Sequence, residues 1–165
     1  MKKVLSKSVK ELLILLEKIE KTMSDIYGSL AVNQTFTDEA RRFWTTMMGA
    51  ELEHAALFRN IRDKARHNKT VQIEINFNID QLLKSYKIMQ KAQKIIRDNE
   101  ISEKQAYKLG FDLEEKLYEF SYCKRVKSNN SEIMKEIRKI DNDTKHHYIL
   151  LHNCALKKLG DLMDQ

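Results

Sequence analysis

Residues 8–31 read SVKELLILLEKIEKTMSDIYGSLA, and their apolar side chains recur every three or four positions. This spacing is that of one face of an α-helix rather than of a β-strand. Ser8 and Glu11 stand at the spacing of a capping box, in which two side chains satisfy free backbone N–H groups at the helix start. The stretch therefore predicts a long helix that buries one face against other elements.

The same periodicity predicts four more helices, over about 37–67, 78–97, 102–127 and 131–159. Each begins at a residue type that caps helices: Thr37, Asn78, Ser102 (with Gln105), and Asn130 or Ser131. Residues 71–77 alternate between apolar and polar side chains, which is a strand signal. Because a single strand would have no partner in a helical chain, we interpret this stretch as an extended part of a crossover. Two long helix pairs joined by a long crossover that contains an additional helix predict an all-α four-helix bundle.

The composition excludes several classes of protein. The chain has no proline and 4 glycines in 165 residues, too few for an all-β fold, which needs a turn about every 8–12 residues. Its 2 cysteines form no Cys-x-x-Cys pair, which excludes zinc ribbons and rubredoxin-type sites. The longest apolar run, Leu12–Leu16, is too short to span a membrane, and we expect no membrane partner. With no flexible linker, we expect one domain over 1–165.

The charge pattern indicates no particular partner. Lys and Arg number 30 against 24 Asp and Glu, and the two signs are interspersed along the chain. The row Lys84, Lys87, Lys91 and Lys94 lacks the interleaved aromatic residues of a nucleic-acid site, so we interpret it as a solvated face and expect no nucleic-acid partner. Residues 1–7 lack the apolar core of a secretory leader, so we expect a cytoplasmic protein with reduced thiols.

Four of the predicted helices place an acid within their apolar row. These residues are Glu20 in the first helix, Glu51 with His54 in the second, Glu115 or its neighbour Glu114 in the fourth, and Asp143 with His146 or His147 in the fifth. Burying one unpaired carboxylate costs several kcal/mol, so acids that share a core indicate a bound cation. A Glu and a His three residues apart project from one helix face, and a mixed oxygen and nitrogen donor set suits iron or manganese.

The acids also form an internal repeat. Tyr27 follows Glu20 by seven residues, as Tyr122 follows Glu115. The segment Glu51-Leu52-Glu53-His54 is echoed by Asp143-Thr144-Lys145-His146. Two related half-sites of this kind predict a dinuclear metal centre.

On these residues the chain resembles the ferritin-like superfamily and, within it, the rubrerythrin-like proteins. The resemblance runs from Glu11 to about Leu151. It implies two iron ions, with manganese or a mixed pair as alternatives. The implied ligands are Glu20 and Glu115 as terminal carboxylates, Glu51 and Asp143 as bridging carboxylates, and His54 and His146 as one imidazole for each ion.

The chain departs from the family pattern at three points. Asp143 stands where the family usually has Glu, and Met48 stands where a rubrerythrin can carry an extra carboxylate. These 165 residues contain no rubredoxin-type module, so we expect turnover to need an external electron donor. The resemblance implies a redox protein that acts on peroxide or dioxygen, with Tyr27 and Tyr122 hydrogen-bonded to ligand carboxylates. The alternative is a non-catalytic metal-binding or interaction module, and a homodimer through an exposed helix face is common in such bundles.

Overall fold

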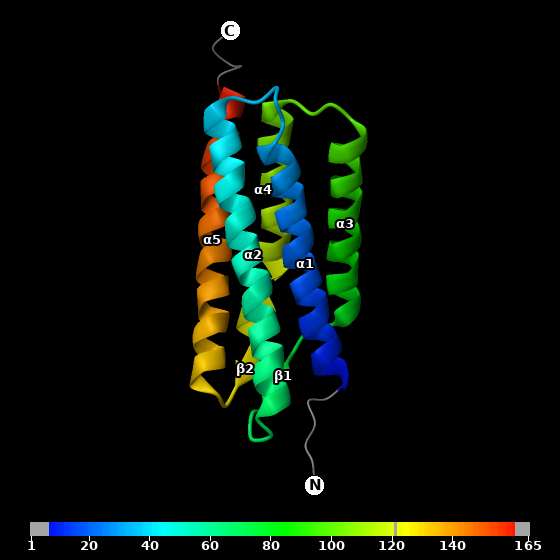
Figure 1. The fold of residues 1–165 in the computed structure, drawn as a ribbon, viewed down its shortest axis with the longest axis vertical. Helices are drawn as coiled ribbons and strands as arrows, with labels where there is room; N and C mark the ends of the chain where they lie inside the picture. Colours follow the sequence, from blue (N-terminus) through cyan, green and yellow to red (C-terminus); the bar gives the residue numbers. More distant parts are fainter. Residues whose placement is uncertain (1–6, 121, 161–165) are drawn as a thin grey trace.

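The computed structural model describes residues 7–120 and 122–160. Within these ranges, five helices lie lengthwise beside one another and a short two-stranded ribbon joins one end (Figure 1). The helices are α1 (Lys7–Ala31), α2 (Asp38–His67), α3 (Ile79–Asp98), α4 (Glu103–Phe120) and α5 (Ser131–Gly160). The prediction of an all-α chain is confirmed apart from the ribbon. The extreme N-terminus, where we expect no secretory leader, lies outside the described ranges.

Helices α2, α3, α4 and α5 begin at the predicted caps, while α1 begins at Lys7, one residue before the predicted cap Ser8. The side chain of Thr37 accepts a backbone N–H at the start of α2. Ser102 and Gln105 form a reciprocal capping box at the start of α4, with distances of 2.9 and 3.2 Å. Asn78 and Asn130 accept backbone N–H groups at the starts of α3 and α5. Short-range hydrogen bonds thus fix four of the five helix starts.

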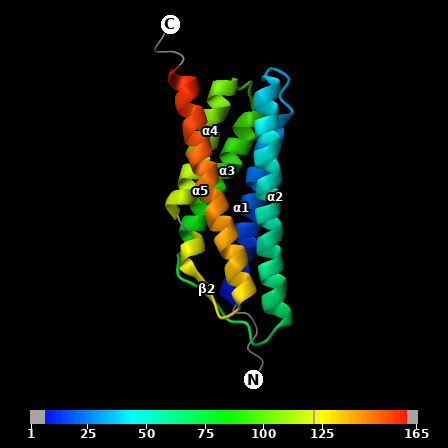
Figure 2. The same cartoon turned by 90° about the vertical axis from the view of Figure 1, so that its left-hand side faces the viewer.

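The ribbon pairs β1 (Ile73–Ile75) with β2 (Val126–Ser128) in antiparallel register. It lies at the end of the molecule where α2 ends and α5 begins (Figures 1 and 2). The inference that residues 71–77 have no strand partner is therefore wrong. Pairing satisfies the backbone N–H and C=O groups along the facing edges of the two strands, and Ile73 and Val126 are buried.

The predicted helix 102–127 is too long. α4 ends at Phe120, and the chain continues through a 3₁₀ turn (Tyr122–Arg125) into β2. Helical periodicity fails to mark this end because a strand of three residues is shorter than one helical turn and shows no alternation of its own.

The helices pack mainly as pairs. α1 packs along α2, α4 along α5, and α3 along α1. Figure 1 shows that α2 and α4 run in the same direction, because the crossover through β1 and α3 returns the chain to the end at which α2 starts. Among the described residues, no helix is long and apolar enough to cross a membrane.

An aromatic cluster fills part of the core between the two pairs. Trp44 of α2 stacks on Tyr27 of α1 at 5.3 Å and lies 5.0 Å from the ring of Tyr107 on α4. All three rings are buried. The cluster therefore packs α1 and α2 against α4.

Candidate metal centre

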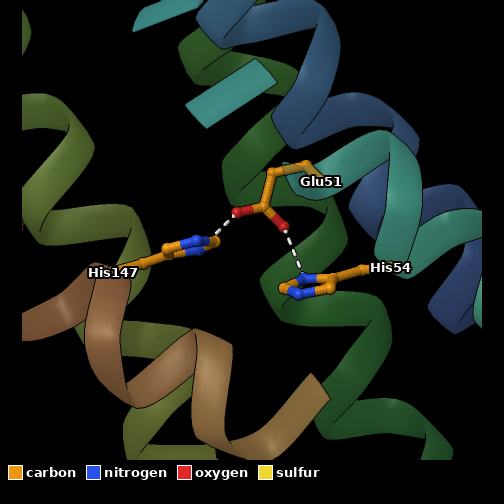
Figure 3. A group of neighbouring side chains, drawn as sticks. All are labelled: Glu51, His54 and His147. Atoms are coloured by element: carbon orange, nitrogen blue, oxygen red, sulfur yellow. Dashed lines mark hydrogen bonds and ion pairs between the residues drawn. The ribbon is translucent and has the colours of Figure 1, made fainter. Parts of the chain in front are cut away.

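A buried carboxylate, that of Glu51 on α2, lies between two imidazoles (Figure 3). Its Oε2 is 3.0 Å from Nδ1 of His54, which lies one turn further along α2. Its Oε1 is 2.8 Å from Nδ1 of His147 on α5. The three residues are 2%, 1% and 7% exposed, and one donor atom from each lies within 4.8 Å of the others. These three side chains could hold one metal ion.

Two further acids are buried beside this group. Oε2 of Glu20 on α1 lies 3.9 Å from Nδ1 of His54. Glu114 on α4 accepts a hydrogen bond of 2.7 Å from the hydroxyl of Tyr27. Both acids are only 1% exposed. Helices α1, α2, α4 and α5 thus each place a carboxylate or an imidazole in one buried region.

The charges of this region depend on one another. Burial opposes the ionisation of Glu51, but the imidazoles of His147 and His54 outweigh it and hold the pKa of Glu51 below its usual value. Burial also opposes charge on His54, but Glu20 and Glu51 raise its pKa to about 11. Without a metal, an imidazolium therefore offsets the carboxylate charge.

The other two acids ionise less readily than exposed glutamates do. Burial raises the pKa of Glu20 to about 7, against the opposing effect of His54. Burial, together with the charge of Glu51, raises the pKa of Glu114 well above its usual value. Because a cation would favour ionisation of both acids, this region can gain negative charge when a metal ion enters.

The contact between Glu51 and His147 provides a test of whether a metal fits here. Oε1 of Glu51 and Nδ1 of His147 are shielded from solvent, and neither makes a hydrogen bond of acceptable geometry although they lie 2.8 Å apart. Buried polar atoms left in this way cost free energy. A cation coordinated by both atoms would remove that cost. Three carboxylates with two imidazoles form a donor set that suits iron or manganese.

The predicted and the observed inward residues differ by one position on α4 and on α5. Glu114 is buried while Glu115 is partly exposed, and His147 is buried while His146 is exposed. The expectation that Glu115 and His146 face inward is wrong, and the alternatives named for each are the inward residues. One position along a helix corresponds to a rotation of about 100°.

Asp143 does not take the bridging position predicted for it. Its side chain is 35% exposed, and Oδ2 lies 2.6 Å from Nζ of Lys139 and 3.3 Å from Nε2 of His54. Three residues before the inward His147 stands Thr144, which is buried. The carboxylate-x-x-His pair of α2 is therefore matched on α5 by Thr144 and His147, and the second half-site has one acid fewer than predicted.

The structure describes the side chain of only one of the two tyrosines predicted to support ligand carboxylates. Tyr27 is buried and its hydroxyl donates a hydrogen bond to Glu114 on another helix, while the role of Glu114 as a metal ligand stays a prediction. Tyr122 starts the 3₁₀ turn, and its side chain lies outside the described part of the structure.

The sequence analysis did not predict that Thr144 faces inward, although the spacing of apolar residues in α5 indicates it. The buried row of α5 follows a regular 4, 3, 4, 3, 4 spacing: Ile133, Ile137, Ile140, Thr144, His147 and Leu151. Continuing the row from its first isoleucine selects Thr144 and His147 together.

Comparison of the chain with protein family models, curated proteins and solved structures found no match.

Proposed function

We propose that the protein is a carboxylate–histidine metal protein in which α1, α2, α4 and α5 form a ferritin-like four-helix bundle. Helix α3 is then the additional helix of the long crossover. The pairing of α1 with α2 and of α4 with α5 supports this arrangement. The shared direction of α2 and α4 supports it as well, since a long crossover produces that direction (Figure 1).

The observation that carries the proposal is the position of Glu51 between His54 and His147, with Glu20 and Glu114 buried beside them. Glu20, Glu51 and His54 would hold one iron or manganese ion. Glu114, His147 and the second oxygen of Glu51 would hold another. Because Thr144 supplies no carboxylate, we expect the first ion to bind more tightly than the second.

Iron bound here would supply electron transfer to peroxide or dioxygen, with electrons taken from an external donor. The residues of the chain bind the metal, orient its ligands and exclude water. Tyr27 orients Glu114 through its hydrogen bond. The buried side chains of Met23, Met47 and Phe58 stand about one helical turn from Glu20, Glu51 and His54 on the same helices.

A non-catalytic metal-binding or interaction module is the second candidate. The observation that favours it is Thr144, because one missing carboxylate weakens the charge balance that two divalent ions need. Consumption of peroxide by the iron-loaded protein with a supplied reductant distinguishes a redox enzyme from this module.

Metal analysis after anaerobic loading with Fe(II) or Mn(II) tests the proposal. We expect bound metal in the wild type and a loss of at least ten-fold in affinity for Glu51→Ala, His54→Ala and His147→Ala. Glu115→Ala and His146→Ala are matched controls, since each lies one residue from an inward ligand and should keep the metal. Equal metal content in the wild type and in the Glu51→Ala protein would contradict the proposal.

A further inference from the structure

One segment within α3 carries basic residues and no acidic one. Residues 81–97, which make up most of α3, contain four lysines, one arginine and no acid. They account for +5 of the net charge of +6. Asp80 and Asp98 stand at the two ends of α3, so the whole helix carries +3, and its positive charges lie between these ends.

The lysines of α3 share one exposed face. Lys84, Lys87, Lys91 and Lys94 follow one another at steps of three and four residues, so they lie along one side of the helix, and all four are exposed. Within residues 7–120 and 122–160, no carboxylate pairs with any of the four. They span roughly 15 Å of helix, so the potential of neighbouring lysines overlaps at physiological ionic strength.

Large aliphatic side chains lie among these lysines. Leu83, Ile88 and Ile95 are 39%, 44% and 51% exposed. The opposite side of the helix buries Leu82 and Met89, and α3 packs on α1. Figure 1 shows α3 at the edge of the molecule. The exposed face of α3 therefore combines lysines with aliphatic side chains.

We propose that the exposed face of α3 docks on an anionic phospholipid bilayer. The lysines lie at the level of the acidic headgroups, and Ile88 and Ile95 reach the boundary of the acyl chains. Charge complementarity identifies the partner as anionic. The isoleucines favour lipid over nucleic acid, because a nucleic-acid surface offers no apolar layer and the exposed lysine face has no aromatic side chain for base stacking. This inference is independent of the metal centre.

Sedimentation of the full chain with phosphatidylcholine vesicles, with and without 30% phosphatidylserine, tests the proposal. We expect binding to the anionic vesicles alone, and weaker binding at high salt. Each lysine replaced by glutamine should reduce the partition coefficient about five-fold. The quadruple variant Lys84→Gln, Lys87→Gln, Lys91→Gln, Lys94→Gln should therefore lose measurable binding.

A matched control separates the α3 face from net charge. Replacing four other exposed lysines by glutamine, at Lys10, Lys18, Lys135 and Lys145, removes the same charge from other helices and should leave most of the binding. Ile88→Ser with Ile95→Ser should reduce binding without changing charge. Any of four results would overturn the proposal. The two quadruple variants could lose binding equally, or the protein could bind neutral vesicles as well as anionic ones. The serine variant could keep full binding, or the protein could bind an oligonucleotide more tightly than anionic vesicles. Circular dichroism confirms that every variant is folded.

Discussion

The hydroxyl of Tyr27 on α1 donates a hydrogen bond of 2.7 Å to the carboxyl group of Glu114 on α4. It joins the two halves of the candidate centre through groups that are both buried. Burial and the nearby acids raise the pKa of both groups well above their usual values, burial being the larger cause. The hydrogen bond therefore joins the neutral phenol of Tyr27 to the carboxyl group of Glu114, which favours its neutral form.

Removing this phenol should destabilise the protein. In Tyr27→Phe, Glu114 loses its hydrogen-bond donor in the core, and we expect unfolding by urea to show a loss of about 1–3 kcal/mol. Tyr86→Phe on α3 is a control in which the same oxygen is removed from a partly exposed ring. Glu114→Gln keeps an acceptor and should cost little stability without metal, while it should weaken metal binding. Equal stability of Tyr27→Phe and the wild type would show that the bond contributes nothing.

The missing carboxylate on α5 can be restored. Thr144→Glu places an acid three residues before His147, as Glu51 stands before His54. We expect the variant to bind about one more equivalent of Mn(II) or Fe(II) tightly, and to be less stable than the wild type when no metal is present, because it buries another acid. Thr144→Val, similar in shape, is the control and should gain no metal. An unchanged metal content in Thr144→Glu would contradict the proposed position of the second half-site.

Gly110 is predicted to be intolerant of a side chain. A Cβ at this position would lie 2.8 Å from Cη2 of Trp44, whose side chain is fully buried. Gly110→Ala should therefore cost about 1–3 kcal/mol despite the better helix propensity of alanine. Gly49→Ala, where no atom lies within 4 Å, is the control and should be neutral or stabilising. Chemical unfolding followed by the fluorescence of Trp44 measures both; equal effects of the two substitutions would contradict the close packing.

An ion cluster around the buried carboxylate of Glu17, between α1 and α2, should make stability depend on pH. Glu17 accepts hydrogen bonds from Lys21, Arg59 and Arg62 at 2.9, 2.9 and 2.6 Å. Burial opposes its charge, but the three cations outweigh it and lower its pKa from 4.5 to about 2. A lowered pKa stabilises the folded state above pH 4.5, and this contribution disappears as the pH falls from 4.5 through 2.

Glu17→Gln should consequently lose about 2 kcal/mol at pH 7, less than the full pKa shift implies because Arg59 and Lys21 are partly solvated. Urea unfolding of the variant and the wild type across pH 2–7 measures this difference. The two stabilities should converge near pH 2. A constant difference over the whole range would show that packing, rather than charge, accounts for the effect.

The sequence predicts the helices and the α2 part of the candidate centre well, because these depend on local patterns. Caps are short-range hydrogen bonds, and Glu51 and His54 fall in an unbroken apolar row. The choice between Glu114 and Glu115 is harder, since adjacent acids differ only by rotation about the helix. Gly110 offered a clue: a glycine inside a helix often marks a close contact, and Glu114 lies one turn after it on the same face.

Other features depend on contacts between distant segments. β2 forms a strand because β1 lies beside it, and three residues show too little pattern to reveal the pairing. The partner of Tyr27 is likewise 87 positions away. Periodicity gives the inward face of each helix, but it does not give which inward residues of different helices lie at the same height.

The position of α5 along the bundle axis, relative to α2, is set at the ribbon. Ser128 donates a hydrogen bond to the carbonyl of Gln72, and the side chain of Asn129 accepts one from Gln72 and donates one to Thr70, so the turn before α5 is anchored to the segment that follows α2. α5 starts at Ser131, and His147 lies roughly 24 Å further along its axis. A slip of α5 by one turn would move His147 by about 5.4 Å and bring the aliphatic Leu151 opposite Glu51. The anchored turn thus fixes the position of α5 along its axis. Inserting residues into this turn would separate the imidazole of His147 from the carboxylate of Glu51 while leaving every helix intact.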